Sequence, residues 1–123
     1  MTEFLYKDLT YQIIGCAMEV HKELGSGFLE KVYENALLIG LSEKEIKAIN
    51  QAPLEVKYHE KVVGEYFADI VVDDSVIIEL KAVRCISAEH RAQIINYLTA
   101  TGTRVGLIIN FGAKSLEYER FVK

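Results

Sequence analysis

The fold of this chain follows from one stretch of its sequence, residues 68–83, which read ADIVVDDSVIIELKAV. Two runs rich in valine and isoleucine flank the turn-forming residues at 73–75, and this pattern predicts an antiparallel hairpin. If these three residues form the loop, Val72 lies opposite Val76 and the remaining pairs follow in step. One face of the hairpin is then entirely apolar, so we expect it to face the core. The residues of that face are Ala68, Ile70, Val72, Val76, Ile78 and Leu80.

The other face of the hairpin carries charged residues in an apolar setting. The same register places Asp69 opposite Glu79, and Phe67 opposite Lys81. Opposed side chains share a face, with Cβ atoms about 4.5–5.5 Å apart. Two carboxylates this close repel one another, and a divalent cation such as Mg²⁺ removes the conflict because hard cations bind carboxylate oxygens. The alternative is a buried ion network of the three charged residues without chemistry, which is a poor source of stability.

The rest of the chain predicts a mixed central β-sheet flanked by helices, of the α/β (α+β) class, as one domain over residues 1–123. Apolar residues recur at helical spacing in the first third of the chain, and alternation of period two begins after Pro53. Ser87 and Gly102 have the properties of a helix N-cap and C-cap. The expected elements are helices over about 3–24 and 28–47, strands over about 54–59, 62–72 and 76–83, a helix over about 88–101, and strands over about 104–111 and 117–123.

Composition limits the classes of function. The 123 residues are 50% hydrophobic with a net charge of −4, which is typical of a globular domain. These totals show no strongly basic face for a phosphate backbone, although a local basic rim is compatible with an acidic remainder. No apolar run approaches the roughly 18 residues of a membrane span, and the N-terminus has no secretory signal pattern, so we expect a cytoplasmic protein. Cys16 and Cys85 can form a bridge, but buried thiols are favoured over a bridge or a metal site.

Several motifs resemble a known family. The stretch GFLEKVY, residues 27–33, is similar to the signature of the small bacterial GxxExxY proteins. Asp69 followed by Glu79-x-Lys81 on the next strand resembles the PD-(D/E)XK nuclease superfamily, to which those proteins belong. The similarity extends in order through EVHKELGSGFLEKVYENAL, QAPLEVKY, EHRAQIINYL and VGLIINFG, nearly the whole chain. It implies an α-β-β-β-α-β core with an extra N-terminal helix.

The resemblance also implies roles for individual residues. Asp69 and Glu79 would hold Mg²⁺ or Mn²⁺, and Glu30 would add a third acidic ligand from a helix. Lys81 would position the attacking water or stabilise developing negative charge. The proline that often precedes the first acid is replaced by Ala68, at a position that varies.

Gln93 and Tyr97 match the QxxxY spacing of exonuclease-like branches of the superfamily, where they would serve catalysis and substrate binding. One helical turn separates them, on a different stripe from the residues we expect to be buried. Without the resemblance, an exposed polar side of an amphipathic helix explains them equally well. The residues expected in the buried stripe are Ala88, Ala92, Ile95 and Leu98. His21 is expected to be a packed structural histidine.

The sequence thus predicts a metal-dependent nuclease that hydrolyses phosphodiester bonds of DNA or RNA. Two alternatives stay open. One is a catalytically silent nucleic-acid-binding or protein-binding module that keeps the fold, because fold alone does not determine function. The other is a subunit that is active only with a partner, either a second copy of the chain or another protein.

Overall fold

The computed structural model of the chain describes residues 6–123. The first three residues of the predicted N-terminal helix, 3–5, lie outside this range. The elements are α1 (Lys7–Leu24), α2 (Glu30–Glu43), β1 (Ala48–Tyr58), β2 (Lys61–Val72), β3 (Val76–Lys81), α3 (Ala88–Thr101), β4 (Val105–Asn110) and β5 (Glu117–Val122).

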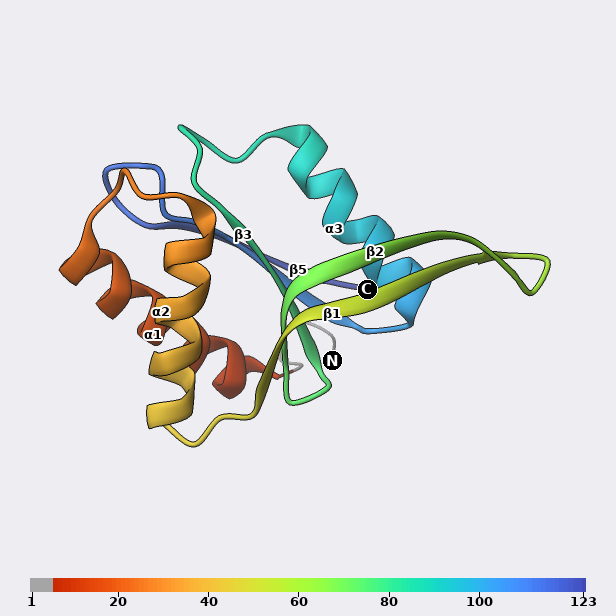
Figure 1. Ribbon diagram of the computed structural model, residues 1–123, viewed down its shortest axis with the longest axis horizontal. Coiled ribbons are helices and arrows are strands. Elements are labelled where there is room, and N and C mark those ends of the chain that lie inside the picture. Colours follow the sequence, from red (N-terminus) through yellow and green to blue (C-terminus); the bar gives the residue numbers. More distant parts are fainter. Residues whose placement is uncertain (1–5) are drawn as a thin grey trace.

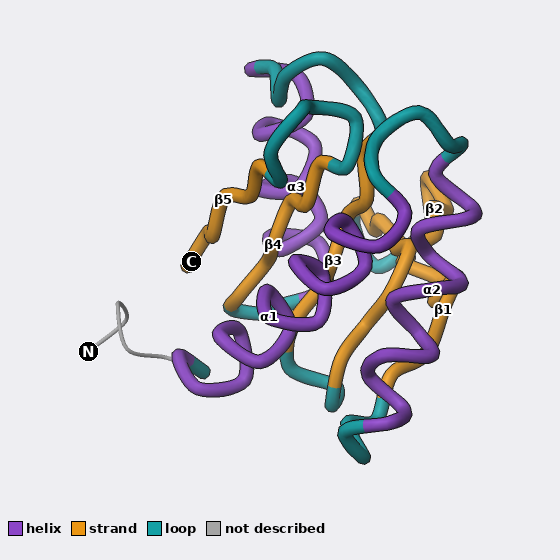
Figure 2. Tube along the Cα trace, turned by 90° about the vertical axis from the view of Figure 1, so that its left-hand side faces the viewer, coloured by secondary structure: helices purple, strands orange, loops and turns teal. Residues whose placement is uncertain are grey.

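The strands form one mixed sheet in the order β1-β2-β3-β4-β5. Neighbouring strands are antiparallel except β3 and β4, which are parallel and are joined through α3. Helices α1 and α2 pack side by side on one face, and α3 lies on the other (Figures 1 and 2). The predicted fold class, a mixed sheet flanked by helices, is confirmed.

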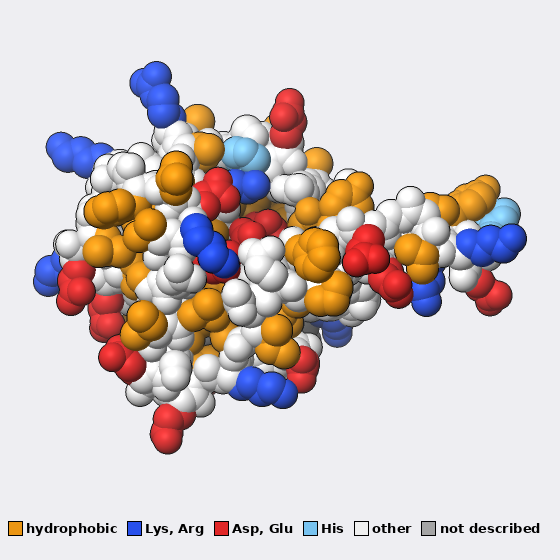
Figure 3. Space-filling model, viewed as in Figure 1, with side chains coloured by type: hydrophobic (Ala, Val, Ile, Leu, Met, Phe, Trp, Pro, Cys, Tyr) orange, Lys and Arg blue, Asp and Glu red, His pale blue; other side chains and the backbone are white. Residues whose placement is uncertain are grey.

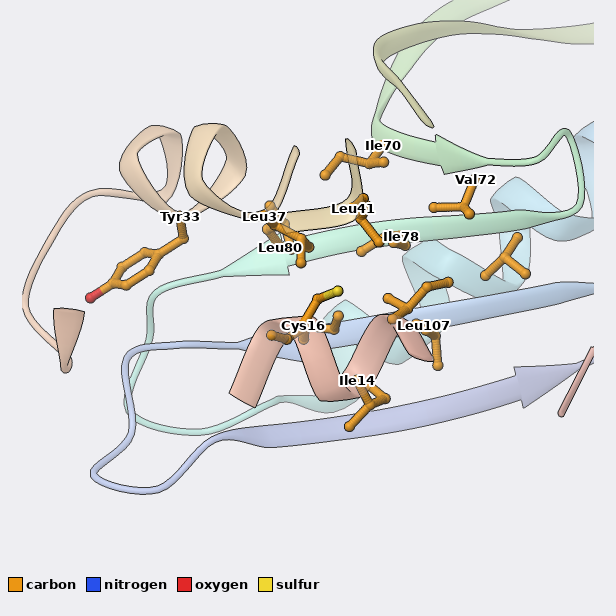
Figure 4. Packing of buried hydrophobic residues seen from close by; sticks show 14 of the residues in the cluster. Ile14, Cys16, Tyr33, Leu37, Leu41, Ile70, Val72, Ile78, Leu80 and Leu107 are labelled. Carbon is orange, nitrogen blue, oxygen red and sulfur yellow. The ribbon is translucent and has the colours of Figure 1, made fainter. Parts of the chain in front are cut away.

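The larger core lies between the sheet and the pair α1 and α2. Tyr33, Leu37 and Leu41 of α2 are fully buried against β3 and its neighbours (Figure 4). All six residues of β4 are buried, as expected for a strand covered on both faces. At roughly 1.5–3 kcal/mol for each fully buried large apolar side chain, this core is the main source of stability.

The loop between β2 and β3 has the predicted length. Val72 pairs with Val76 across the residues at 73–75, and Asp73 and Asp74 adopt left-handed backbone angles of φ 51° and 52°. Aspartate tolerates this conformation better than most residues, which explains the Asp-Asp pair in the turn. The predicted register is therefore confirmed at the loop end of the hairpin.

Further from the loop, β2 leaves β3. The backbone pairing ends at Ile70 and Ile78, and beyond it the backbone N–H of Leu80 donates to the side chain of Asp69 over 2.7 Å. We call this point the fork. The expectation that Phe67 lies across from Lys81 was wrong, because beyond the fork Phe67 pairs only with β1.

At the level of the fork, the backbone of the neighbouring strand β1 is also irregular. Gln51 of β1 has a left-handed φ of 51°, and the ladder to β2 skips it between the Asn50 and Ala52 pairs. The expectation that Ala68 shares the core face with Ile70 was also wrong. Ala68 instead packs on the α3 side, because the chain changes its facing at the fork.

Beyond the fork, β1 and β2 continue as a two-stranded arm that projects from the body of the protein (Figures 1 and 3). The arm ends in a two-residue turn formed by His59 and Glu60, with φ 50° and 67°. Positive φ at both central residues is the requirement of a type I′ hairpin turn. Pro53 is tolerated in β1 because β1 is an edge strand.

One helix boundary and one buried stripe differ from expectation. Helix α2 ends at Glu43 rather than near residue 47, because Glu45 adopts a left-handed φ of 60° and the strand β1 already begins at Ala48. Helix α3 has the predicted caps, Ser87 and Gly102. Its buried residues, however, are Ile94, Tyr97 and Leu98, whereas Ala88, Ala92 and Ile95 are exposed, because the stripe facing the sheet is rotated from the expected one.

The cysteines are not bridged. Cys16 is buried in α1, as expected, whereas Cys85 is exposed in the loop after β3, where we expected a buried thiol. Among residues 6–123, no helix is both long enough and apolar enough to cross a membrane.

Candidate active site at the fork

The fork places Asp69 between the diverging strands. Its side chain is half-buried and accepts the Leu80 N–H bond at 2.7 Å. Burial raises the pKa of Asp69, and this bond opposes the rise because it favours the charged form. The separation of β2 from β3 therefore creates the gap that the Asp69 carboxylate fills.

Glu79, on β3, lies beside Asp69 and is almost completely buried, with 6% of its surface exposed. Burial, followed by the charge of Asp69, raises the pKa of Glu79 to about 8, while Lys81 acts in the opposite direction. Its Oε1 atom is buried and has no hydrogen-bond partner. A buried polar atom left unpartnered is costly, so this atom is a candidate ligand for a group that binds at the fork.

The two carboxylates fit a hard divalent cation. Such ions bind carboxylate oxygens, and a cation would satisfy Oε1 of Glu79 and remove the repulsion from Asp69. Within residues 6–123, no group of three or more His, Cys, Asp and Glu side chains is arranged to hold a metal. The donors from side chains are therefore this pair, and acidic side chains gather in a hollow near the base of the arm (Figure 3).

A chain of polar contacts connects β3 to α3. Lys81 Nζ donates to Gln93 Oε1 over 3.5 Å, and Gln93 Nε2 donates to Tyr97 Oη over 3.0 Å. Burial raises the pKa of Tyr97, and the charge of Glu79 raises it further. The structure thus brings together Lys81, Gln93 and Tyr97 beside the carboxylate pair, as the sequence analysis expected.

The carboxylate of α2 that influences the pKa of Asp69 is that of Glu34, not that of Glu30. Glu30 is the first residue of α2 and is exposed, whereas Glu34, one turn later, is buried with 4% of its surface exposed. The charge of Glu34 is among the influences that raise the pKa of Asp69, and that of Glu30 is not. A ligand role for Glu30 stays a prediction, and its exposed position in the first turn of the helix does not favour it.

Glu34 is held by three neighbours. Lys31 donates to its Oε2 at 2.7 Å, Gln51 donates to Oε1 at 2.9 Å, and Asn50 donates more weakly at 3.4 Å. Gln51 makes its contact from the left-handed backbone conformation opposite Asp69. Non-glycine residues in this conformation are strained by about 1–3 kcal/mol and cluster at functional sites. Sequence reasoning missed Gln51, since no local pattern indicates a left-handed glutamine inside a strand.

A second unpredicted residue, Asn110, fixes the backbone beyond Lys81. Asn110 is fully buried at the end of β4; its Oδ1 accepts from the N–H groups of Val83 and Gly112, each at 3.0 Å. Its Nδ2 donates to the carbonyl of Val83 and to Glu117, each at 2.9 Å. The amide thus uses all of its hydrogen-bonding capacity. The sequence feature that could have indicated this residue is a polar side chain at the end of the apolar run VGLIIN.

The tyrosine of the motif GFLEKVY, Tyr33, has a structural role. Tyr33 is fully buried, donates to the carbonyl of Gly25 at 2.6 Å, and accepts from the N–H of Phe28. Its ring stacks on Phe111 with centroids 4.5 Å apart. His21 contacts the carbonyl of Ala113 at 3.0 Å, as a packed structural histidine would. These contacts tie the start of α2 to the loop after β4.

Comparison with known proteins agrees with this geometry. A family model described as the PD-(D/E)XK nuclease superfamily matches residues 7–121, so the chain belongs to that superfamily. A crystal structure of a protein called SSO0001 has a similar fold, with a TM-score of 0.60 at 18% identity. That alignment covers 76% of this chain but 49% of SSO0001, so the chain spans about half the length of that protein. No curated protein shows significant similarity to the chain.

Proposed function

We propose that the chain is a metal-dependent nuclease that hydrolyses phosphodiester bonds of DNA or RNA. The observation that carries the proposal is the buried, unpartnered Oε1 of Glu79 beside Asp69 at the fork. Membership of the nuclease superfamily supports a nucleic-acid substrate, and nucleases of this superfamily generally use divalent metals. The motif at residues 27–33 further supports placing the chain among the GxxExxY proteins.

Asp69 and Glu79 are the proposed ligands of Mg²⁺ or Mn²⁺. When bound, such an ion supplies a Lewis acid for the phosphoryl group and lowers the pKa of bound water. Glu79 must lose its proton to serve as a ligand, and Lys81 favours that loss by lowering the pKa of the carboxyl. Glu30 remains a proposed third ligand from α2, whereas Glu34, held by Lys31 and Gln51, acts on the pKa of Asp69 through its charge.

Lys81 and Gln93 are the proposed catalytic partners. The ammonium of Lys81 neutralises negative charge that develops on the phosphate, or orients the attacking water. Gln93 accepts from Lys81 and donates to Tyr97, so it fixes the direction of the ammonium. Tyr97 is the proposed contact to substrate. A cytoplasmic location and a homodimer or protein partner remain proposals beside this one.

The test combines cleavage with metal-dependent stability. The parent protein is incubated with single-stranded and duplex DNA and RNA, in millimolar Mn²⁺ or Mg²⁺ and in EDTA, beside Asp69→Asn and Lys81→Ala. A matched control is Asp73→Asn, an exposed acid in the loop of the same hairpin, where asparagine suits the left-handed backbone. We expect cleavage by the parent and by Asp73→Asn in the presence of metal, and a loss of at least a hundredfold in the other two variants.

Thermal melting gives a second readout that does not require turnover. A ligand that binds only the folded state stabilises it by about 2.7 kcal/mol at a hundredfold excess over Kd. Mn²⁺ should therefore raise the melting temperature of the parent and of Asp73→Asn, and raise that of Asp69→Asn much less. Equal shifts in all three proteins, or none, would leave the charged cluster as a structural ion network. A metal shift without cleavage of any substrate would instead favour the silent module or the partner-dependent subunit.

A further inference from the structure

A groove with a volume of about 1190 Å³ runs between the arm and α3. The arm contributes residues from both of its strands, and residues of α3 form the opposite wall. Helix α3 lies beside the arm in Figure 1. The lining includes Glu55, Lys57 and Tyr66 on the arm, with Glu89, Asn96 and Tyr97 on α3. Pockets for small molecules usually enclose roughly 300–1,000 Å³, so this groove is large enough for an extended polymer segment.

The lining of the groove does not include Asp69, Glu79 or Lys81, but it approaches the fork through two residues of α3. Gln93 and Tyr97 line the groove, and the same two side chains connect to Lys81 through the contacts at 3.5 and 3.0 Å. Tyr97 also lies close enough to Glu79 for that charge to raise its pKa. A polymer in the groove would therefore reach the carboxylate pair at one end.

The charges of the groove do not suit a duplex. Its lining has one basic side chain, Lys57, against the two acids Glu55 and Glu89. Proteins that grip duplex DNA neutralise several phosphates with lysine and arginine, and these contacts supply most of the nonspecific affinity. An electrostatic grip on two phosphate backbones is therefore missing along this lining.

The remaining side chains suit unpaired bases. Tyr66 is 48% exposed and its ring centroid lies 5.6 Å from that of Tyr97, which gives an aromatic surface inside the groove. Asn96 adds an exposed amide on the opposite wall. Aromatic rings stack on bases of any sequence, and amides hydrogen-bond to base edges that pairing would otherwise occupy.

We propose that this groove binds the unpaired bases of a single-stranded segment of nucleic acid, and that the adjoining phosphate lies at the fork. This inference rests on the proposed nuclease function, and it names the substrate of that site as a single strand. Tyr66 is the stacking platform, Asn96 contacts base edges, and Lys57 contacts one phosphate.

Binding without turnover tests the inference. Fluorescence anisotropy in EDTA compares a labelled single-stranded oligonucleotide, as DNA and as RNA, with the same sequence in a blunt duplex. Tyr66→Ala removes the platform, Tyr66→Phe keeps it, and Tyr118→Ala is the matched control. Tyr118 is 46% exposed on β5, at the opposite edge of the sheet. Asn96→Ala tests the other wall at an exposed position.

We expect the parent to bind the single strand at least tenfold more tightly than the duplex. Tyr66→Ala should weaken single-strand binding at least fivefold, consistent with about 1–3 kcal/mol for one stacked base, while Tyr66→Phe and Tyr118→Ala bind as the parent does. Asn96→Ala should weaken it by a smaller factor. With Lys57 and Lys81 as the phosphate contacts, the plot of log K against log salt should have a shallow slope of about −1.4.

Equal or tighter binding of the duplex, or equal binding by Tyr66→Ala, Asn96→Ala and Tyr118→Ala, would overturn the inference. The cleavage assay with Mn²⁺ is scored separately. Groove-dependent binding without cleavage would refute the nuclease and preserve the single-strand site. If the parent and Tyr66→Ala cleave duplex equally well in the presence of metal, the nuclease proposal stands and the single-strand site is refuted.

Discussion

Replacing Glu79 by glutamine should change how the stability of the metal-free protein depends on pH. The substitution keeps the shape of the side chain and removes the carboxyl whose pKa is raised to about 8 by burial and by Asp69. In the unfolded chain this carboxyl has an ordinary pKa near 4.5. Between these two values the folded protein binds the proton and the unfolded chain does not, so the free energy of unfolding falls as the pH rises.

The size of this effect follows from the two pKa values. The stabilising contribution is fully present below about pH 4.5 and is lost as the pH rises through about 8. One pH unit within that interval is worth about 1.4 kcal/mol, which gives a total loss of about 5 kcal/mol and a loss of about 3 kcal/mol by pH 7. The Glu79→Gln variant lacks this loss, although Asp69, whose pKa is also raised, retains a share of the pH dependence.

Urea denaturation in EDTA at pH 5, 6, 7 and 8 measures the difference. The parent should lose stability steadily over this range, and Glu79→Gln should lose about 2.5 kcal/mol less between pH 5 and pH 7. Glu55→Gln, at an exposed position on β1, is the control and should follow the parent. Parallel curves for the parent and Glu79→Gln would refute the buried, proton-binding carboxyl on which the site is built.

Three further predictions concern the metal, the loop after β3 and the arm. Because binding at Glu79 displaces a proton, Mn²⁺ affinity measured by calorimetry should rise by up to about tenfold per pH unit below pH 8 and then level off, and a flat profile would contradict this. Asn110→Ala leaves buried backbone groups unpartnered and should lower the free energy of unfolding by about 2–4 kcal/mol in urea, whereas a loss under 1 kcal/mol would refute a structural role. His59→Asn combined with Glu60→Gly suits the type I′ turn and should raise the free energy of unfolding by about 1 kcal/mol, with a decrease as the contrary result.

Local sequence determined much of the fold. The register of the hairpin followed from a three-residue loop, and Val72 does pair with Val76. Ser87 and Gly102 capped α3 as expected, because capping depends on residues within one turn. The convergence of Gln93 and Tyr97 on Lys81 was anticipated from helical spacing together with the family resemblance.

Features that depend on distant contacts could not be predicted. Whether Glu30 or Glu34 is buried depends on where α2 begins and on the side chains of Asn50 and Gln51, which come from another element. Where β2 separates from β3, the Asp69 side chain accepts the Leu80 N–H, and alternation alone does not reveal this. Burial of Asn110 likewise depends on the backbone of the loop 82–87.

The hydrogen bond from the Leu80 N–H to Asp69 also places a natural spectroscopic probe at the fork. An amide proton bonded to a carboxylate resonates downfield, and its chemical shift changes when that carboxylate gains a proton or shares its charge with an ion. The ¹⁵N resonance of Leu80 should therefore follow events at Asp69 without any substitution in the site. Slow exchange of the same proton with deuterium would report how often β2 and β3 separate further, so one peak records both the charge and the opening of the strands.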